Sequence, residues 1–365
     1  MSRIAFYAPL KSPDHPVPSG ERTMARLLLR ALDAAGFTPE IASTLRTRDP
    51  QGSRHPALRA ESLAEADRLV ARYRADPPAL WFTYHVYYKA PDWIGPAVSA
   101  ALGIPYVVAE GSRAGKRAHG PHALGHAGAE AALDAADLIL VMNRRDRPAL
   151  EAARPGRQAL ADLPPFLDPG DWPAAAAGRR PGPLRLLAVA MMREGDKLAS
   201  YRLLADVLGR LGDRPWTLDA AGDGPAAAEV AALLAPFGPR VRRHGTVPPA
   251  ALSALYAAAD LLVWPAVNEA WGMALLEAQA HGCPVVAGGY GGVPEVVRDG
   301  VTGRVTLPGD AAAMAGAIRD LAEAPDRLAA MREGALAFAR SERGLDGAAA
   351  ALRTMLGPLL RERRA

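Results

Sequence analysis

The chain has 365 residues, of which half are apolar and 22% are charged, and this composition excludes a disordered or fibrous protein. A single cysteine, Cys283, excludes an internal disulfide framework and a cysteine-based zinc site, and fits a reducing cytoplasm. The formal net charge of +4 is weak evidence for nucleic acid, so we expect no nucleic-acid partner, although it could favour an anionic substrate or a lipid surface.

No apolar run is long enough to span a membrane, and the first run is too short for a signal peptide. We therefore expect a cytoplasmic protein, and peripheral contact with the inner face of the membrane stays open.

Short apolar runs, each expected to form a strand, alternate with helical segments along most of the chain. In the first half the expected strands are residues 3–9, 39–43, 79–86, 105–110 and 137–142, with helices such as 21–36 and 91–103 between them. In the second half they are residues 184–190, 215–222, 240–245, 260–265, 284–288 and 303–307. This alternation predicts parallel sheets covered by helices on both faces.

The alternation breaks in a segment rich in proline and glycine, which we interpret as a linker over residues 166–183. The fold class is therefore α/β, with two doubly wound Rossmann-like domains, residues 1–165 and 184–340, facing a central cleft. We expect the last segment, residues 341–365, to form a helix that returns to the first domain. Ligands of such sheets bind at the carboxyl ends of the strands, so the cleft is the expected site.

One stretch predicts an anion site. The run that ends at Pro265 is followed by a loop with Glu269 and by a helix that begins near Gly272. The free amides of Gly272, Met273 and Ala274 suit a pyrophosphate, because a helix N-terminus carries a partial positive charge. Glu277 lies about two turns from Glu269 and could accept hydrogen bonds from a vicinal diol of the same ligand.

Two isolated glutamates are more often an exposed loop residue and an ordinary helix residue, but here the flanking pattern is specific. The stretch "NEAWGMALLEAQAHGCPVVAGGYGGVPEVVRDGVTGRVTLPGD" resembles the signature of the family 4 retaining glycosyltransferases. It contains, in order, a Glu-x7-Glu pair, a Gly-x-Pro-Val-Val-Ala segment, a Gly-Gly-x-Pro-Glu-Val-Val segment and an Asp-Gly-x-x-Gly segment. "AGDGPAAAEVAALL" and "VRRHG" extend the resemblance backwards, and the loop "VPSGER" matches more loosely.

The resemblance implies the two-domain GT-B architecture, with the donor on the second domain and the acceptor on the first. It implies a nucleotide-diphosphate sugar as donor, no cofactor, and an unidentified acceptor such as a glycan, a small molecule or a lipid-linked group. It assigns the ribose to Glu277 and the donor sugar to Glu269, and it places Gly20, Gly222 and His244 in the donor site. No Asp-x-Asp motif occurs, so we expect no metal.

The chain departs from the family at the end of residues 184–190. The family places Gly-Arg there and a lysine about five residues later, and both cations neutralise the leaving diphosphate. Lys197 matches the lysine, but Met192 stands in the arginine position and Arg193 comes one residue late. Either the loop bulges and Arg193 enters the site, or a cation from "GSRAGKR", Arg113 or Arg117, replaces it.

The first domain departs as well, because Glu110 follows residues 105–109 where the family often has a histidine. Three histidines, His119, His122 and His126, come later in a glycine-rich loop with several basic residues. Solvated histidines and a phosphate or acceptor contact both stay open there, as does the role of His85.

Two rival functions remain. "GDGPAA" at Gly222 could begin a dinucleotide site of an oxidoreductase, but no acidic residue follows about twenty positions later. A non-catalytic sugar-nucleotide-binding protein would keep Glu277 without turnover.

Overall fold

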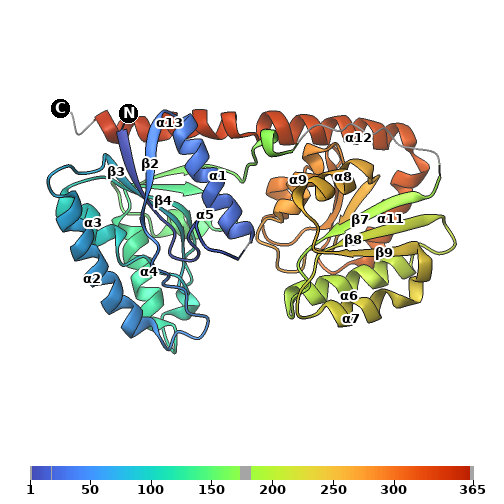
Figure 1. Ribbon diagram of the computed structural model, residues 1–365, viewed down its shortest axis with the longest axis horizontal. Helices are drawn as coiled ribbons and strands as arrows, with labels where there is room; N and C mark the ends of the chain where they lie inside the picture. The colour runs from blue at the N-terminus through green and yellow to red at the C-terminus, as the bar shows by residue number, and fades with distance from the viewer. Residues whose placement is uncertain (1, 18, 173–181, 362–365) are drawn as a thin grey trace. The chain divides into compact units, whose positions relative to one another are not determined.

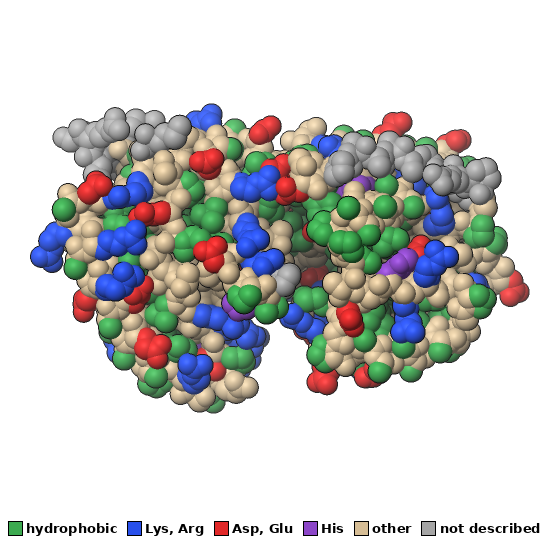
Figure 2. Space-filling model, in the orientation of Figure 1, with side chains coloured by type: hydrophobic (Ala, Val, Ile, Leu, Met, Phe, Trp, Pro, Cys, Tyr) green, Lys and Arg blue, Asp and Glu red, His purple; other side chains and the backbone are tan. Residues whose placement is uncertain are grey.

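The computed structural model describes residues 2–17, 19–172 and 182–361. The chain divides into two compact units, the first formed by Met1–Pro164 with Leu345–Ala365 and the second by Pro165–Gly344. Figure 1 labels many of the elements of both units, and Figure 2 shows the charged side chains on the same face of the molecule.

The first unit is built on a six-stranded parallel sheet with the order β2-β1-β3-β4-β5-β6. Its strands are β1 (Ser2–Tyr7), β2 (Phe37–Ser43), β3 (Leu80–Val86), β4 (Tyr106–Gly111), β5 (Leu138–Val141) and β6 (Ala159–Asp162). The strand order reverses between β1 and β3, so this is the point where such sheets bind ligands.

Helices cover this sheet on both faces (Figure 1). They are α1 (Gly20–Ala34), α2 (His55–Tyr73), α3 (Gly95–Leu102), α4 (Ala123–Ala135), α5 (Arg147–Ala152) and α13 (Leu345–Arg361). α1 begins at a serine cap, because the hydroxyl of Ser19 accepts a hydrogen bond from the amide of Arg22 (3.3 Å). α13 packs against α1 through a stripe of buried residues that includes Leu352 and Leu356.

The second unit also has a six-stranded parallel sheet, with the order β12-β11-β10-β7-β8-β9. Its strands are β7 (Leu184–Val189), β8 (Trp216–Ala221), β9 (Val241–Gly245), β10 (Leu261–Trp264), β11 (Val285–Gly288) and β12 (Gly303–Thr306). This is the strand order of the dinucleotide-binding fold, and it reverses between β7 and β10.

The helices of the second unit lie on both faces of its sheet (Figure 1). They are α6 (Asp196–Gly209), α7 (Ala227–Leu234), α8 (Pro249–Ala258), α9 (Met273–Ala280), α10 (Val293–Val296), α11 (Ala311–Glu323) and α12 (Pro325–Ala337). α6 packs on α7 and α11, whereas α9 packs on α8 and α12.

The predicted α/β fold with two doubly wound sheets is confirmed, and each run expected to be a strand contains one. β6 was not predicted, because "ALAD" is short and only half-buried at the edge of its sheet. No helix in the described part of the chain is long and apolar enough to cross a membrane.

The segment interpreted as a linker lies partly outside the described residues, at 173–181. Before that gap, Phe166 and Leu167 are buried, and Leu167 packs in a core cluster with Leu276 and Phe338. The described start of this segment is therefore packed against the second unit, because its apolar side chains find a surface there.

Candidate functional site

The loop between β10 and α9 has a constrained backbone at the point where the strand order of the second sheet reverses. Ala266 and Asn268 have positive φ angles of 60° and 49°, and Gly272 has a φ of 74°. Two residues of α6 hold the loop: the Ser200 hydroxyl accepts from the amide of Val267 (2.9 Å), and Asp196 accepts from the Asn268 side chain (2.9 Å). Such strain often accompanies functional positions.

A second loop, residues 288–292, lies directly against this one. A Cβ on Gly291 would overlap the carbonyl oxygen of Glu269, and one on Gly292 would overlap that of Ala270. The amide of Gly292 also donates to the carbonyl of Ala270 (2.6 Å). The glycines are required because the two backbones approach too closely for any side chain.

The N-terminus of α9 is open. Gly272 caps the helix without a side-chain hydrogen bond, so the amides of its first turn carry no side-chain partner. Free amides and the helix dipole together favour an anion at this position. The predicted helix start at Gly272, Met273 and Ala274 is thus observed.

Lys197 and Glu269 contact each other beside this helix end. The Lys197 ammonium, in the first turn of α6, forms an ion pair with a Glu269 carboxylate oxygen, which also accepts from the indole of Trp264 (3.2 Å). The ammonium lies 5.6 Å from the centre of a Trp264 ring. The structure therefore brings together two of the three residues predicted to be catalytic.

Met192 and Arg193, in the loop after β7, differ in their surroundings. Met192 is buried, and its backbone bonds to Asp223 (2.9 Å) and Ala226 (2.9 Å), which fixes this part of the loop. Arg193 is exposed, and its side chain forms no hydrogen bond or ion pair with the described residues. Its guanidinium is therefore available to a ligand.

Gly222 serves the packing of this loop. A Cβ there would overlap the carbonyl oxygen of Ala190, and one on Gly224 would overlap that of Met192. The first βα turn of this unit, after β7, has no glycine pair of this kind, so Gly222 is poorly placed for a dinucleotide. His244, on β9, pairs with Asp219 on β8 (2.6 Å).

Glu277 lies on α9 in an aromatic setting. The Tyr256 hydroxyl donates to one carboxylate oxygen (2.8 Å), and burial raises the pKa of Glu277 although this hydrogen bond lowers it. His281 stacks on Tyr256 with the rings 5.3 Å apart, and its Nδ1–H donates to the carbonyl of Glu277 (2.8 Å). The ring of Trp172 meets Tyr256 edge-on at 5.9 Å. The Tyr256 and Trp172 contacts could not be predicted, because nothing in the motif indicates them.

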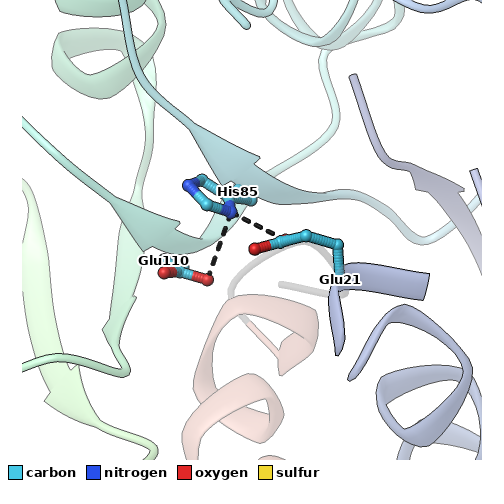
Figure 3. A group of neighbouring side chains, drawn as sticks. All are labelled: Glu21, His85 and Glu110. Carbon is cyan, nitrogen blue, oxygen red and sulfur yellow. Dashed lines mark hydrogen bonds and ion pairs between the residues drawn. The ribbon is translucent and has the colours of Figure 1, made fainter. Parts of the chain in front are cut away.

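The first unit has its own polar cluster, Glu21, His85 and Glu110, where its strand order reverses (Figure 3). His85 Nδ1 lies 2.9 Å from Glu21 and 3.5 Å from Glu110. His85 and Glu110 lie one residue before the ends of β3 and β4 and have positive φ angles of 65° and 62°. The sequence left the role of His85 open and did not indicate Glu21. Gly20, the residue before Glu21, begins α1 and has open space around it.

Electrostatics in this cluster favour a charged imidazole. Burial alone would lower the pKa of His85, but the carboxylates of Glu110 and Glu21 raise it to about 9. Burial raises the pKa of Glu110, whereas the pKa of Glu21 is lowered because His85 and Tyr84 outweigh its burial. The three side chains offer one ligand atom each to a metal, all within 4.8 Å, although His85 already links both carboxylates.

Some of the charged side chains in the glycine-rich segment of residues 111–128 form ion pairs. Arg113 binds both Glu130 and Asp134, so it is not a free cation. The ring of His122 meets Tyr88 edge-on at 4.9 Å, His126 lies 3.7 Å from Glu130, and His119 is exposed.

Residues 183–324 match the model of the family Glycosyl transferases group 1. This part of the chain is therefore similar to the group 1 glycosyl transferases. Lys197, Glu269 and Glu277 lie inside it, as do Gly222 and His244, whereas Gly20 and the Glu21 cluster lie outside the matched residues. The predicted resemblance is confirmed.

Curated relatives that match the chain are described as D-inositol 3-phosphate glycosyltransferases. The chain is 36% identical over 191 residues to the D-inositol 3-phosphate glycosyltransferase of Segniliparus rotundus, a match that covers 51% of this chain and 40% of the relative. It is 37% identical over 155 residues to that of Thermobispora bispora, covering 42% of this chain and 34% of the relative. The chain thus spans well under half the length of these relatives.

Solved structures resemble the whole chain. Sucrose-phosphate synthase from Thermosynechococcus elongatus has a TM-score of 0.75 at 20% identity and covers 99% of this chain and 100% of its own. Anabaena Alr3699/HepE in complex with UDP has a TM-score of 0.74 at 17% identity and covers 98% of this chain and 100% of its own. The predicted GT-B fold is confirmed.

Proposed function

We propose that the protein is a retaining, metal-independent glycosyltransferase that uses a nucleoside-diphosphate sugar. One observation carries the proposal: an open helix N-terminus, a lysine and two glutamates lie together where the strand order of the glycosyl transferase domain reverses. Its curated relatives are named as glycosyltransferases, and the similar HepE structure holds UDP, so UDP is the first nucleotide to test.

The diphosphate binds at the N-terminus of α9. Negative charge grows on the leaving diphosphate as the sugar bond breaks, and fixed amides and cations stabilise that charge. Lys197 now pairs with Glu269. A bound diphosphate replaces Glu269 as the ion-pair partner of the Lys197 ammonium. Glu269 is then free to accept hydrogen bonds from donor-sugar hydroxyls.

Glu277 binds the ribose. Tyr256 occupies one of its carboxylate oxygens and thereby fixes the orientation of the group. The other oxygen has no hydrogen bond to a described residue, so it can accept a ribose hydroxyl. His281 stacks on the Tyr256 ring and helps to hold it in place. Burial lowers the pKa of His281, so this ring is neutral.

The test is calorimetry with UDP, followed by turnover of a UDP-sugar in EDTA. Glu277→Ala should weaken UDP binding ~10-fold or more, because UDP retains the ribose. Glu269→Ala should leave UDP affinity within a few-fold but reduce turnover. Equal loss of UDP affinity in both variants would show that the roles are wrong. Activity that needs added magnesium would contradict the metal-independent mechanism, and NMR of the product anomer would test retention.

The rival function is a binding protein without turnover. It is favoured by Met192, which is buried and uncharged in the position where the family has an arginine. This function predicts that UDP binding depends on Glu277 and that no UDP is released from a UDP-sugar, whichever acceptor is added.

A further inference from the structure

Basic side chains gather on three loops of the first unit, each of which follows a strand at the carboxyl edge of the sheet. Arg46 and Arg48 follow β2, Lys89 follows β3, and Lys116 and Arg117 follow β4. We call these five residues the cation cluster. β2 and β3 flank β1, and β4 pairs with β3, so the loops that follow these strands emerge at neighbouring positions along one edge of the sheet.

Direct contacts hold these loops together. The amide of Asp49 donates to the carbonyl of Lys89 (2.8 Å), and the Thr47 hydroxyl donates to the carbonyl of Pro91 (2.7 Å). The Tyr88 ring has the Lys89 ammonium 5.5 Å and the Arg117 guanidinium 5.2 Å from its centre. Lys89 and Arg117 therefore converge on one aromatic ring although they come from different loops.

No carboxylate neutralises this charge. None of the five cations forms an ion pair within the described part of the chain, in contrast to Arg113 nearby. Asp49, which follows Arg48 in the chain, accepts hydrogen bonds from the amides of Gln51 (3.1 Å) and Arg54 (2.7 Å), and it forms no ion pair with these cations in the described part of the chain. The pKa of His122 is lowered by burial and further by His55, Lys89 and Arg117, as expected next to unpaired positive charge.

The Glu21–His85–Glu110 cluster adjoins this basic surface. The ring of Tyr87 lies 5.0 Å from His85 and 5.5 Å from Tyr88, so the two groups share an aromatic border. Glu110 is only 7% exposed, and its buried Oε2 atom faces His85 Nδ1 at 3.5 Å. His85 offsets one of the two carboxylate charges, and the one that remains cannot cancel the five positive charges of the cation cluster.

We propose that the first unit binds a phosphate-bearing polyol as acceptor, with the cation cluster on the phosphate and the Glu21–His85–Glu110 cluster beside the hydroxyls. This deepens the proposed function, on which it rests. Guanidinium and ammonium groups without counter-charges bind phosphate through charge-assisted hydrogen bonds. Carboxylates accept hydrogen bonds from hydroxyls, and aromatic rings such as Tyr88 pack against the apolar face of a sugar or cyclitol.

The experiment measures binding of inositol 3-phosphate and of inorganic phosphate to the full chain by calorimetry. Lys89→Ala and Arg117→Ala should each weaken inositol 3-phosphate binding ~10-fold, as expected for the loss of a charge-assisted hydrogen bond. Arg59→Ala is the matched control, because Arg59 is an exposed α2 residue without an ion pair in the described residues. It removes the same charge and should have no effect.

UDP binding is measured on the same variants. UDP affinity should stay at the wild-type value in Lys89→Ala and Arg117→Ala, which also shows that they fold. If the wild-type chain does not bind UDP, the proposed function is refuted. Failure of the proposed function can therefore be distinguished from failure of the acceptor inference. Equal inositol 3-phosphate affinity in Arg117→Ala and Arg59→Ala would overturn the inference.

A second arm separates a free phosphate from a lipid headgroup. Wild-type chain is sedimented with phosphatidylcholine vesicles that contain or lack phosphatidylinositol phosphate. Capture by the phosphorylated vesicles that is lost in the Lys89→Ala, Arg117→Ala double variant assigns the phosphate to a lipid. Binding of soluble inositol 3-phosphate without such capture assigns it to a free small molecule. No binding to either probe overturns the inference.

Discussion

At the scale of single residues, Lys197 and Arg193 offer two cations in unlike surroundings. Lys197 is held by Glu269 and Trp264, whereas Arg193 is exposed and unpaired in the described residues. We expect Lys197→Ala and Arg193→Ala each to lower kcat by ~10-fold or more, because each removes charge stabilisation of the leaving group. Steady-state kinetics with a UDP-sugar measures this.

Arg202→Ala serves as the control for these variants, since Arg202 also lies on α6 but pairs with Glu229 at its surface. It should leave kcat unchanged. Wild-type kcat in Arg193→Ala would mean that the second cation comes from elsewhere. Of the two alternatives considered, Arg113 is bound by Glu130 and Asp134, whereas Arg117 forms no ion pair within the described residues.

His85 should make stability depend on pH. Its pKa is raised from 6.5 to about 9 in the folded protein by Glu110 and Glu21, although burial opposes this. A raised pKa means that the folded state holds the proton more tightly, so this stabilisation is complete below pH 6.5 and is lost as pH rises through about 9. The melting temperature of the first unit should therefore fall between pH 7 and 9.5.

His85→Asn tests this directly, since asparagine tolerates the positive φ angle at this position. Its melting temperature should fall less between pH 7 and 9.5 than that of the wild type. An NMR titration of the His85 ring that gives a pKa below 6.5 would contradict the prediction.

At the scale of elements, the loop of residues 288–292 packs against residues 269–270, just before the N-terminus of α9. Gly291→Ala should destabilise the second unit by more than the ~1–2 kcal/mol cost of a left-handed residue, because its Cβ also overlaps the Glu269 carbonyl. Gly300→Ala is the matched control, with φ of 79° and open space. Thermal melting should rank Gly291→Ala well below Gly300→Ala, and equal melting temperatures would show that the loops are not tightly packed.

Most elements were predictable because apolar runs and helical periodicity are local properties. β6 escaped because an edge strand that is half-buried needs no apolar run. The start of α9 was predictable from Gly272 and its motif, but the reason for Gly291 was not, since its neighbour Glu269 is 22 positions away. The Glu21–His85–Glu110 cluster joins three distant segments, and only the sheet order brings them together.

At the scale of the whole molecule, α13 completes the first unit from the far end of the chain. Its Leu352 and Leu356 are fully buried, and the Arg353 side chain donates to the carbonyls of Ala34 (3.0 Å) and Ala35 (3.0 Å) at the end of α1. A chain that stops at residue 344 should therefore lose the cooperative unfolding of the first unit while the second unit persists.

Hydrogen exchange measures this unit by unit. Amides of β1 and β3 should lose protection in the shortened chain, whereas those of β10 and β11 should keep it. Leu352→Ala in the full chain should weaken the first unit alone, by about 2–5 kcal/mol for a buried leucine. Loss of protection in both units would contradict this division.

The chain passes from the first unit to the second at residue 164 and back at residue 344. On a ribosome, residue 344 leaves the exit tunnel before α13, so the second unit is the first to have all of its residues available for folding. We therefore expect the second unit to complete its fold before the first, although N-terminal domains generally fold first. Until α13 emerges, the face of α1 that it covers is exposed to solvent, so we expect chaperones to bind the first unit at this stage.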